Sequence, residues 1–281
     1  MKKRLMTCLL LLFFASSMFS ACGLQESSLN KNQIMRVHYI DVGQGDSILI
    51  QVNGINMLID AGPAENSDIL ISYLKKQKIR KLHYIVATHP HEDHIGGMPA
   101  VIQKFDIGKF YAPKIIAETR YFEDMAVSLK EKGLMISPAR KGTFLSLGQK
   151  TECQMLSPCS ESYDNLNNYS SVIRITYGSS SFLFTGDAEE LAETEIISTG
   201  ANIDCDVLKA GHHGSSTSSS NQLLEAATPD TAVISAGKRN DYGHPSKTVL
   251  SALEKIDAQV YRTDIDGTIV LECDGAKIIK D

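Results

Sequence analysis

Residues 88–97 read "THPHEDHIGG" and place three histidines and two carboxylates within six consecutive positions. The whole chain has only eight histidines in 281 residues, so this density does not follow from its composition. A packed core does not tolerate such groups without partners, and a solvated loop has no need of them. The pattern therefore predicts that these side chains bind a ligand together.

His89 and His91 stand two residues apart at the end of a predicted strand, so their side chains project to the same side. Asp93 and His94 follow in a loop that the glycines at 96–97 allow to turn. Imidazole and carboxylate without thiolate suit a borderline metal ion such as Zn²⁺, Mn²⁺ or Fe²⁺. The spacing divides into two pairs, His89 with His91 and Asp93 with His94, and favours one ion for each pair.

Two more predicted strands end in residues of the same type. "SFLFTGD" (181–187) ends in Asp187, whose two carboxylate oxygens can bridge two ions, and "DVLKAGHHG" (206–214) carries His212 and His213. Each has an ordinary explanation by itself: Asp187 as the N-cap of a helix, hydrogen-bonded histidines, or a polar loop. Three strand ends that all finish in ligand-type residues favour a shared metal site.

The N-terminus has the pattern of an export signal. "MKKR" is followed by the apolar run "LLLLFFASSMF" (9–19), which is short for a membrane span, and then by "FSAC" ending at Cys22. This resembles a bacterial lipoprotein signal, in which the cysteine becomes a lipid-bearing N-terminus. We predict a signal peptide over residues 1–21 and a protein exported and lipid-anchored to the outer face of the cell membrane. Ordinary secretion is the alternative.

The rest of the chain divides into a tether and one domain. Residues 22–34 are polar and aperiodic, which is typical of a flexible tether, and residues 35–281 are long enough for one domain with a substantial core. The formal net charge is −5, and removal of the three basic residues of "MKKR" makes it −8. An acidic domain is a poor general polyanion binder, which counts against tight binding to duplex DNA.

Four cysteines fall in the predicted domain without the CxxC spacing of a thiolate zinc site. In an exported protein they can form one or two disulfides, with Cys153 and Cys159 the nearest pair in sequence, or remain buried thiols. The sequence leaves both alternatives open for Cys153, Cys159, Cys205 and Cys273.

Short β-rich runs alternate with amphipathic helices along the domain. A first set of strands is predicted within residues 35–89, and a second set within 151–273 that includes "GTIVLEC" (267–273). Helices are predicted over 67–78, 119–133, 188–198 and 247–256. Two sets of strands, each with helices, predict an α+β fold: an αββα four-layer sandwich of two packed mixed sheets with helices on both outer faces.

The order "LIDAG" (58–62), "THPHEDHIGG", "FTGD" and "LKAGHHGS" resembles the metallo-β-lactamase superfamily of αββα hydrolases. More closely, "DVGQGDSILI" (41–50), "NNYSSVIRITYG" (167–178) and "YGHPSKTVL" (242–250) resemble the extracytoplasmic hydrolase-like domain of ComEC, a bacterial DNA-uptake channel protein. The resemblance covers the chain from about residue 35 to its end. It implies two divalent metal ions, zinc or manganese.

The resemblance also implies a role for each matching residue. The first ion would take His89, His91 and Asp187, and the second Asp93, His94, Asp187 and His213. Asp60 matches a supporting aspartate, and His244 matches a histidine at the rim of the site. We place Asp41, Asp46 and His212 among the supporting residues, His212 because neighbouring side chains on a strand point to opposite faces.

One departure from the family pattern stands out. The third histidine that most two-metal members carry before the bridging aspartate is missing, since no histidine occurs between Ile95 and Gly186. "NNYSS" (167–171) occupies the matching region, so we predict that Asn168 or Ser171 faces the metals or the substrate. The first ion would then bind weakly or prefer Mn²⁺.

A bound metal lowers the pKa of water from about 15.7 to about 7, and two ions neutralise charge that develops on a phosphoryl group. Phosphodiesters therefore fit this site best. Asp93 or Asp187 would orient the attacking hydroxide, and His244 would stabilise charge or protonate the leaving oxygen. Lys209 is predicted to meet a phosphate.

Three functions are consistent with the sequence. The first is a membrane-anchored phosphodiesterase or nuclease acting on single-stranded DNA, although no Trp and no clustered Lys/Arg track is present. The second is hydrolysis of a small or cell-envelope phosphodiester such as a phosphocholine ester, with Tyr169, Tyr177 and Tyr242 as candidates for an aromatic cage. The third is a metal-binding lipoprotein without enzymatic activity. The thin ligand set disfavours a true β-lactamase.

Overall fold

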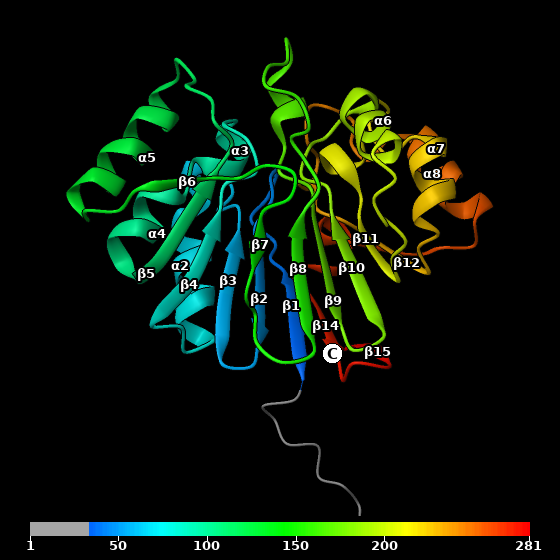
Figure 1. Ribbon diagram of the computed structural model, residues 1–281, viewed down its shortest axis with the longest axis horizontal. Coiled ribbons are helices and arrows are strands. Elements are labelled where there is room, and N and C mark those ends of the chain that lie inside the picture. The colour runs from blue at the N-terminus through cyan, green and yellow to red at the C-terminus, as the bar shows by residue number, and fades with distance from the viewer. Residues whose placement is uncertain (1–33) are drawn as a thin grey trace, which may run out of the picture. The chain divides into compact units, whose positions relative to one another are not determined.

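The computed structural model describes residues 34–281 and builds them into two β-sheets (Figure 1). The larger sheet has the strand order β15-β14-β1-β2-β3-β4-β5-β6, and the smaller has the order β13-β12-β11-β10-β9-β8-β7. The strands are β1 Met35–Tyr39, β2 Ile48–Val52, β3 Ile55–Ile59, β4 Lys81–Val86, β5 Asp106–Ala112, β6 Ile136–Pro138, β7 Phe144–Leu145, β8 Thr151–Met155, β9 Ile173–Tyr177, β10 Ser180–Phe184, β11 Val207–Lys209, β12 Thr231–Ile234, β13 Gln259–Arg262, β14 Ile269–Cys273 and β15 Ile278–Lys280.

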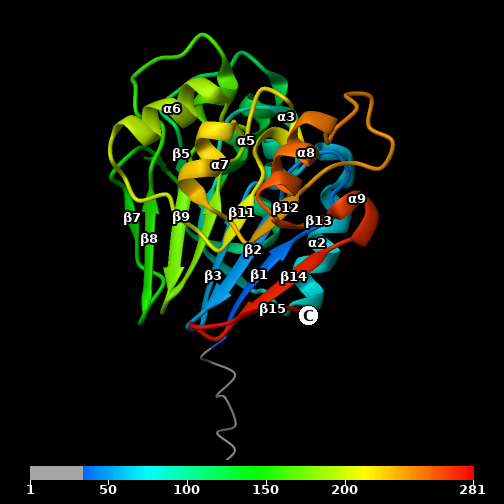
Figure 2. The same cartoon turned by 90° about the vertical axis from the view of Figure 1, so that its right-hand side faces the viewer.

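Helices cover the outer face of each sheet. Figures 1 and 2 show α2, α4 and α5 on the side of the larger sheet and α6, α7 and α8 on the side of the smaller one. The α-helices are α2 Ser67–Lys76, α3 Glu92–Ile95, α4 Met98–Lys104, α5 Arg120–Glu131, α6 Glu190–Ser198, α7 Asn221–Ala227, α8 Lys247–Lys255 and α9 Thr263–Asp266, and the 3₁₀ turns are η2 Ala64–Asn66, η3 Leu166–Tyr169 and η4 Gly211–Gly214. The predicted αββα sandwich is confirmed.

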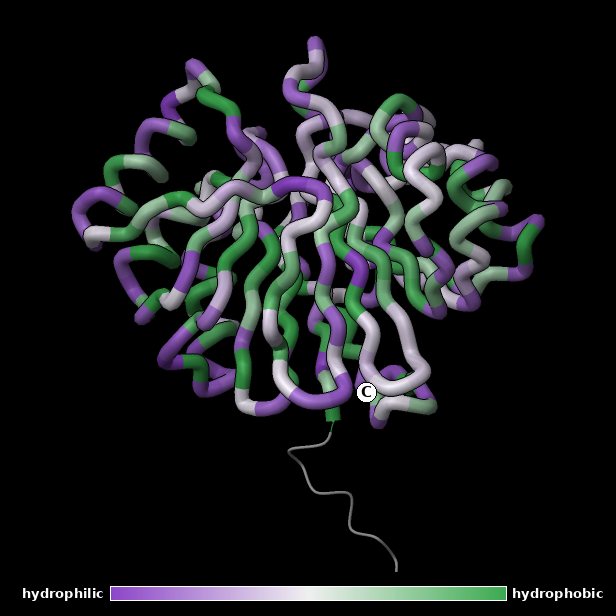
Figure 3. The backbone as a smooth tube through the Cα atoms, viewed as in Figure 1, coloured by the Kyte–Doolittle hydropathy of each residue, from purple (hydrophilic) through white to green (hydrophobic). Residues whose placement is uncertain are grey.

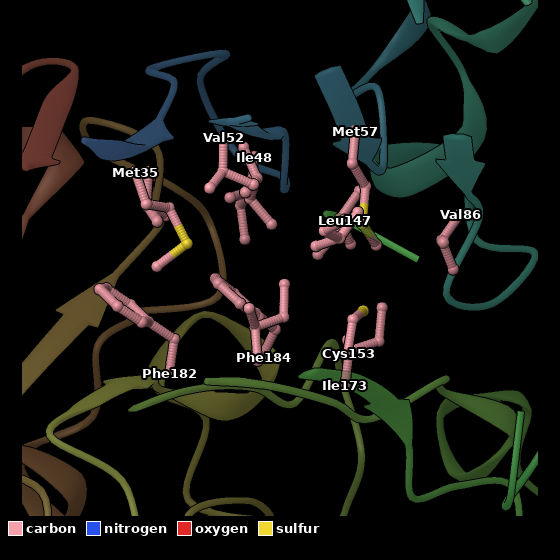
Figure 4. Close-up of a cluster of buried hydrophobic side chains, with 14 of the residues drawn as sticks. Met35, Ile48, Val52, Met57, Val86, Leu147, Cys153, Ile173, Phe182 and Phe184 are labelled. Carbon is pink, nitrogen blue, oxygen red and sulfur yellow. The ribbon is translucent and has the colours of Figure 1, made fainter. Parts of the chain in front are cut away.

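The alternation of side chains along β1 explains why the sheets stack. Met35, Val37 and Tyr39 point into the core between the sheets, while His38 points to the opposite face. Phe182 and Phe184 of β10 meet this core from the smaller sheet (Figure 4). Two further apolar clusters lie between each sheet and its helices, and the tube in Figure 3 shows the apolar strands inside the more polar helices.

Local capping sets the helix boundaries. Thr119 caps α5 by accepting a hydrogen bond from the Phe122 N–H, and Ser246 caps α8 in the same way through Val249. The helix predicted over 188–198 begins at Glu190 with Glu189 at its N-cap position, so Asp187 does not cap it. The ordinary explanation of Asp187 as a helix cap is therefore excluded.

The assignment of residues 267–273 to the second set of strands is wrong. Strand β14 pairs antiparallel with β1 in the larger sheet, with Val37 opposite Leu271. The chain leaves the smaller sheet after β13, turns through α9 and Gly267, and crosses over. The reason lies in β1, which is a central strand and needs a hydrogen-bonding partner on its second side.

The parallel strands place the candidate site. Strands β3, β4 and β5 run parallel in one sheet, and β10, β11, β12 and β13 run parallel in the other. Carboxyl ends of parallel strands meet at one edge of a sheet. Asp60 follows β3, His89 follows β4 and Asp187 follows β10, so the predicted ligands gather where the two sheets share that edge.

Three features outside the site complete the fold. The four cysteines of the domain, Cys153, Cys159, Cys205 and Cys273, are free thiols. Of the two alternatives that the sequence left open, the structure therefore has thiols and not disulfides. Within residues 34–281, no helix has the length and apolar character to cross a membrane. The predicted signal peptide, tether and lipidated Cys22 lie outside the described residues, so export and lipid anchoring remain proposals.

Candidate metal centre

One carboxylate oxygen, Oδ2 of Asp187, lies at the centre of the predicted ligands. The Nε2 atoms of His94 and His213 lie 3.2 and 3.4 Å from it. Those of His89 and His212 lie 3.9 and 3.8 Å from it. Asp187 is 1% exposed, so four imidazoles surround one buried carboxylate.

A tighter group of four forms the ligand set predicted for the second ion. Asp93, His94, Asp187 and His213 each offer one ligand atom, and these atoms all lie within 4.8 Å of one another. Asp93 and His94 sit in the first turn of the short helix α3, and Asp187 follows β10. The cluster therefore draws ligands from both sheets.

The hydrogen bonds around this cluster test whether it fits a cation. His94 Nδ1 lies 2.8 Å from Asp60 Oδ2, and His213 Nδ1 lies 3.0 Å from the Ser235 carbonyl oxygen. Both partners accept, so each Nδ1 carries a proton. Burial lowers the pKa of His94 and of His213, but Asp187 and the other carboxylates offset this and hold both pKa values well above the ordinary value, so the two rings are charged without metal. Asp187 Oδ1 and His94 Nε2 are buried without a hydrogen-bond partner. These ligand-type atoms would fit a divalent cation that replaces the Nε2 protons of the two rings.

The ligands predicted for the first ion are less closely gathered. His89 Nε2 lies 3.0 Å from His91 Nδ1 and 3.9 Å from Asp187 Oδ2. Burial, with the neighbouring His94 next in effect, lowers the pKa of His89 well below its ordinary value, so this imidazole is neutral and able to act as a ligand. His89, His91 and Asp187 fit an ion with fewer protein donors than the second.

Without a metal, the charged histidines His94 and His213 balance the negative charge of Asp187. Burial by itself raises the pKa of the Asp187 carboxyl, but His94 and His213 offset this and hold it well below its usual range. Asp60, which accepts hydrogen bonds from both the backbone N–H and the hydroxyl of Thr88, fixes the ring of His94. The predicted supporting role of Asp60 agrees with this geometry.

His212 occupies a different place from the one predicted. Strand β11 ends at Lys209, and His212 and His213 lie in η4 with positive φ values of 49° and 53°. The strand alternation that was expected to turn His212 away therefore does not apply. His212 lines the same pocket as His213, and its Nδ1 lies 3.5 Å from Glu189 Oε1.

Lys209 does not line the pocket, so the prediction that it meets a phosphate is wrong. Its side chain is fully buried, and its Nζ lies 2.7 Å from Asp46 Oδ2 and donates to the Ala210 carbonyl oxygen at 2.8 Å. Burial raises the pKa of Asp46, but Lys209 and His213 offset it and keep the carboxylate ionised. The Asp46 Oδ1 lies 3.4 Å from His213 Nδ1, so the ion pair supports a metal ligand.

The residues predicted to replace the missing third histidine also face elsewhere. Asn168 Oδ1 accepts from the Glu189 and Ala192 N–H groups at the start of α6, and the buried Ser171 hydroxyl points to the Thr88 carbonyl oxygen. Ser170, which the sequence reasoning missed, is the closer residue. Its Oγ accepts from the Asp187 N–H at 3.0 Å and lies 3.4 Å from His89 Nδ1. The sequence shows two consecutive serines, Ser170 and Ser171, and has no signal that tells which one points toward the metal ligands.

A pocket of about 470 Å³ opens over the cluster. Asp93, Asp187, His212 and His213 line it, and His244 lies at its wall with the ring of Tyr242 stacked on it at 5.6 Å. Burial, followed by the neighbouring His212 and His213, lowers the pKa of His244.

Two predicted supports are not at the pocket. Asp41 holds the turn before β2 by accepting a hydrogen bond from the Gly43 N–H. It does not line the pocket, so the prediction that it supports the ligands is wrong. Of the three tyrosines considered for a cation cage, Tyr242 lines the pocket, whereas Tyr169 and Tyr177 are buried elsewhere. A phosphocholine cage is therefore not assembled by them.

Comparisons with known proteins agree with this geometry. The sequence profile of the Metallo-beta-lactamase superfamily matches residues 40–238. ComE operon protein 3 of Bacillus subtilis (strain 168) is 32% identical over 251 residues, and competence protein ComA of Neisseria gonorrhoeae is 29% identical over 231 residues. The alignments cover 83% and 82% of this chain but 32% and 31% of those proteins, so the chain spans about a third of their length.

A solved structure shares the fold at low sequence identity. The metallo-beta-lactamase fold protein YhfI from Bacillus subtilis aligns with a TM-score of 0.56 and 14% identity, over 85% of this chain and 100% of that one. At this identity the likeness concerns the fold alone.

Proposed function

Since this chain belongs to the metallo-beta-lactamase superfamily, we propose that it is a metal-dependent hydrolase of phosphodiester bonds with single-stranded DNA as its substrate. The observation that carries the proposal is the convergence of His94, His213 and Asp93 on the buried Asp187 carboxylate at the floor of an open pocket. The name of one relative, competence protein ComA, and the resemblance to the DNA-uptake protein support nucleic acid as the substrate.

Six side chains would hold two divalent cations, with Asp187 common to both sets: His89, His91, Asp93, His94, Asp187 and His213. Two such ions, zinc or manganese, supply a nucleophile from water at neutral pH and neutralise charge on the phosphoryl oxygens. The first set, two imidazoles and the shared carboxylate, has fewer protein donors than the second and would hold its ion more weakly.

The protein's own side chains supply orientation. The Asp93 carboxylate is partly exposed in the pocket and can accept a hydrogen bond from an attacking water. The lowered pKa of His244 keeps its ring neutral at pH 7, so it donates a hydrogen bond to a phosphoryl oxygen rather than a proton to the leaving group. Of the two roles predicted for His244, charge stabilisation is the one that this electrostatic setting favours.

The experiment is an assay of the purified full-length chain with Mn²⁺ or Zn²⁺. The substrates are bis-p-nitrophenyl phosphate, an end-labelled single-stranded oligonucleotide and p-nitrophenyl phosphocholine. We expect hydrolysis of the first two, with loss of at least about a thousandfold in Asp187→Asn, because this change removes charge from the oxygen that both ion sets share. Asp230→Asn, a carboxamide change at an exposed position far along the chain, is the matched control.

Two results would overturn the proposal. Cleavage of the phosphocholine ester alone would reassign the substrate to the cell envelope. Bound metal with no cleavage of any substrate would favour the non-enzymatic alternative.

A further inference from the structure

A second groove, of about 630 Å³, lies outside the metal pocket. One wall is the turn between β6 and β7 at Ala139–Thr143, and the facing wall is the loop after β8 at Pro158–Glu161. Lys114, after β5, completes the rim, and Tyr169 forms part of the floor. In Figure 1 the chain that leaves β6 crosses the front of the molecule to reach β7. We call this feature the cationic groove.

The charges in the cationic groove are unbalanced. Lys114, Arg140 and Lys141 are exposed, and Glu161 is the one acidic residue in its lining. Among residues 34–281, the ion pairs formed by lysine or arginine involve others: Arg36, Arg120, Lys209, Arg262 and Lys280. Three unpaired cations therefore meet on a protein whose formal net charge is −5. Such a local excess attracts a polyanion that the molecule as a whole would repel.

The turn that carries two of these cations is held in place by its backbone. The Lys141 N–H donates to the Pro158 carbonyl oxygen at 3.1 Å, and the Gly142 N–H donates to that of Met155 at 2.9 Å. The two walls of the groove are thus hydrogen-bonded to each other. A prearranged site loses less conformational entropy when a ligand binds.

The cationic groove adjoins the His89 side of the metal centre through two segments. Tyr169 of its floor precedes Ser170, whose hydroxyl contacts both the Asp187 N–H and His89. Lys114 of its rim follows Pro113, which lines a small cavity together with His89. His244 and Tyr242 line the metal pocket and do not line the groove. Residues that line the groove are thus immediate chain neighbours of residues that contact His89 or line a cavity with it.

We propose that the cationic groove binds the phosphate backbone of single-stranded nucleic acid on one side of the scissile phosphodiester. The proposal rests on the proposed function for the position of the scissile bond, but its binding step can be measured without cleavage. Lys114, Arg140 and Lys141 contact successive phosphates, and sequence is not read because no base-specific contact is required.

The test compares the wild-type chain with the triple variant Lys114→Gln, Arg140→Gln, Lys141→Gln. A control triple, Lys75→Gln, Lys76→Gln, Arg80→Gln, makes the same charge change at exposed positions on and after α2. Binding of a labelled 20-nucleotide oligo-dT is followed by fluorescence anisotropy at several salt concentrations. Cleavage of the oligonucleotide and of bis-p-nitrophenyl phosphate is measured on the same samples, and circular dichroism confirms that each variant is folded.

We expect the groove variant to bind the oligonucleotide at least about tenfold more weakly at low salt, with the slope of log K against log salt smaller by about 2, as three lost contacts to a single strand imply. Hydrolysis of bis-p-nitrophenyl phosphate, which is too small to reach the groove, should stay within about twofold of the wild type. Glu161→Gln should tighten binding, because it removes the one opposing charge.

Three outcomes would overturn the proposal that the cationic groove binds the phosphate backbone of single-stranded nucleic acid. The first is unchanged affinity and salt slope in the groove variant, and the second is an equal loss in the control triple. The third is strong binding of a polyglycerol phosphate of equal charge with none of the oligonucleotide, which would assign the surface to an envelope polymer. A wild-type chain that cleaves neither substrate overturns the proposed function instead, and the anisotropy data still decide the groove.

Discussion

At the scale of single residues, the Asp187 carboxylate is the group around which the predicted metal ligands gather. Four imidazole Nε2 atoms lie within 3.9 Å of its Oδ2, and its backbone N–H is held by Ser170. A carboxylate so buried is stable only with positive charge around it. In the absence of metal the histidines provide that charge, and a cation would take over the same position.

Lys209 provides the sharpest test at the residue scale. If it bound substrate, Lys209→Ala would raise KM and leave folding unchanged. Because it neutralises the buried Asp46, we expect a loss of about 3–5 kcal/mol in the free energy of unfolding, since an unpaired charge stays behind. Urea denaturation followed by circular dichroism measures this.

The double variant Asp46→Asn, Lys209→Met serves as the control for Lys209→Ala. It removes both charges and should be less destabilised than the single change. A single variant that unfolds like the wild type but binds substrate poorly would restore the original prediction for Lys209.

At the scale of elements, a buried histidine joins β1 to α2. His38 Nε2 donates to Gln51 Oε1 at 3.0 Å, and its Nδ1 accepts from the Tyr73 hydroxyl at 2.8 Å. Burial lowers the pKa of His38 from 6.5 to about 4, despite the opposing effect of Gln51. The neutral ring is therefore part of the contact between the sheet and its helix.

This pKa predicts a pH dependence of stability. Between pH 6.5 and about 4 the unfolded chain binds a proton at His38 that the folded chain does not, so stability falls as the pH falls through that window. Since one pKa unit corresponds to about 1.4 kcal/mol, the contribution lost is about 3 kcal/mol. Urea unfolding at pH 7 and pH 4 should show this loss in the wild type and not in His38→Asn.

His83→Asn is the matched change for His38, at a ring that is partly exposed. It should leave the difference between pH 7 and pH 4 close to that of the wild type. If His38→Asn and the wild type lose stability in parallel, the titrating group lies elsewhere.

On the scale of the whole molecule, the metal centre joins the two halves of the sandwich. Asp93 and His94 belong to the segment after β4 of the larger sheet, while Asp187 and His213 follow strands of the smaller sheet. An ion held by all four would act as a cross-link between layers that otherwise meet through their apolar faces.

Removal of metal should therefore lower the stability of the entire domain. A ligand present at 100 times its Kd stabilises the folded state by about 2.7 kcal/mol. We expect a chelator to lower the Tm measured by calorimetry and Mn²⁺ or Zn²⁺ to restore it. The Asp187→Asn variant should show no response to either treatment, and an identical Tm with and without metal would argue against the cross-link.

Much of the fold was accessible from sequence because local patterns decide it. The period-2 alternation of β1, the capping Thr119 and the apolar strand before Asp187 each reflect contacts within a few residues. The ligand motif also follows from local order, since His89, His91, Asp93 and His94 are adjacent in the chain. Short elements such as β6, β7 and α9 were not predicted, because none has more than four residues and no periodic pattern shows over so few.

The sequence by itself determined the type of ligand, the α+β sandwich and the residues that would meet at the sheet edge, because residue chemistry and periodicity are local properties. Only the tertiary structure decided that β14 joins the first sheet, that Lys209 is buried against Asp46, that His212 faces the pocket and that Lys114, Arg140 and Lys141 share a groove. The physical reason is that burial, backbone turns with positive φ and the pairing of charges depend on neighbours that are distant in the chain.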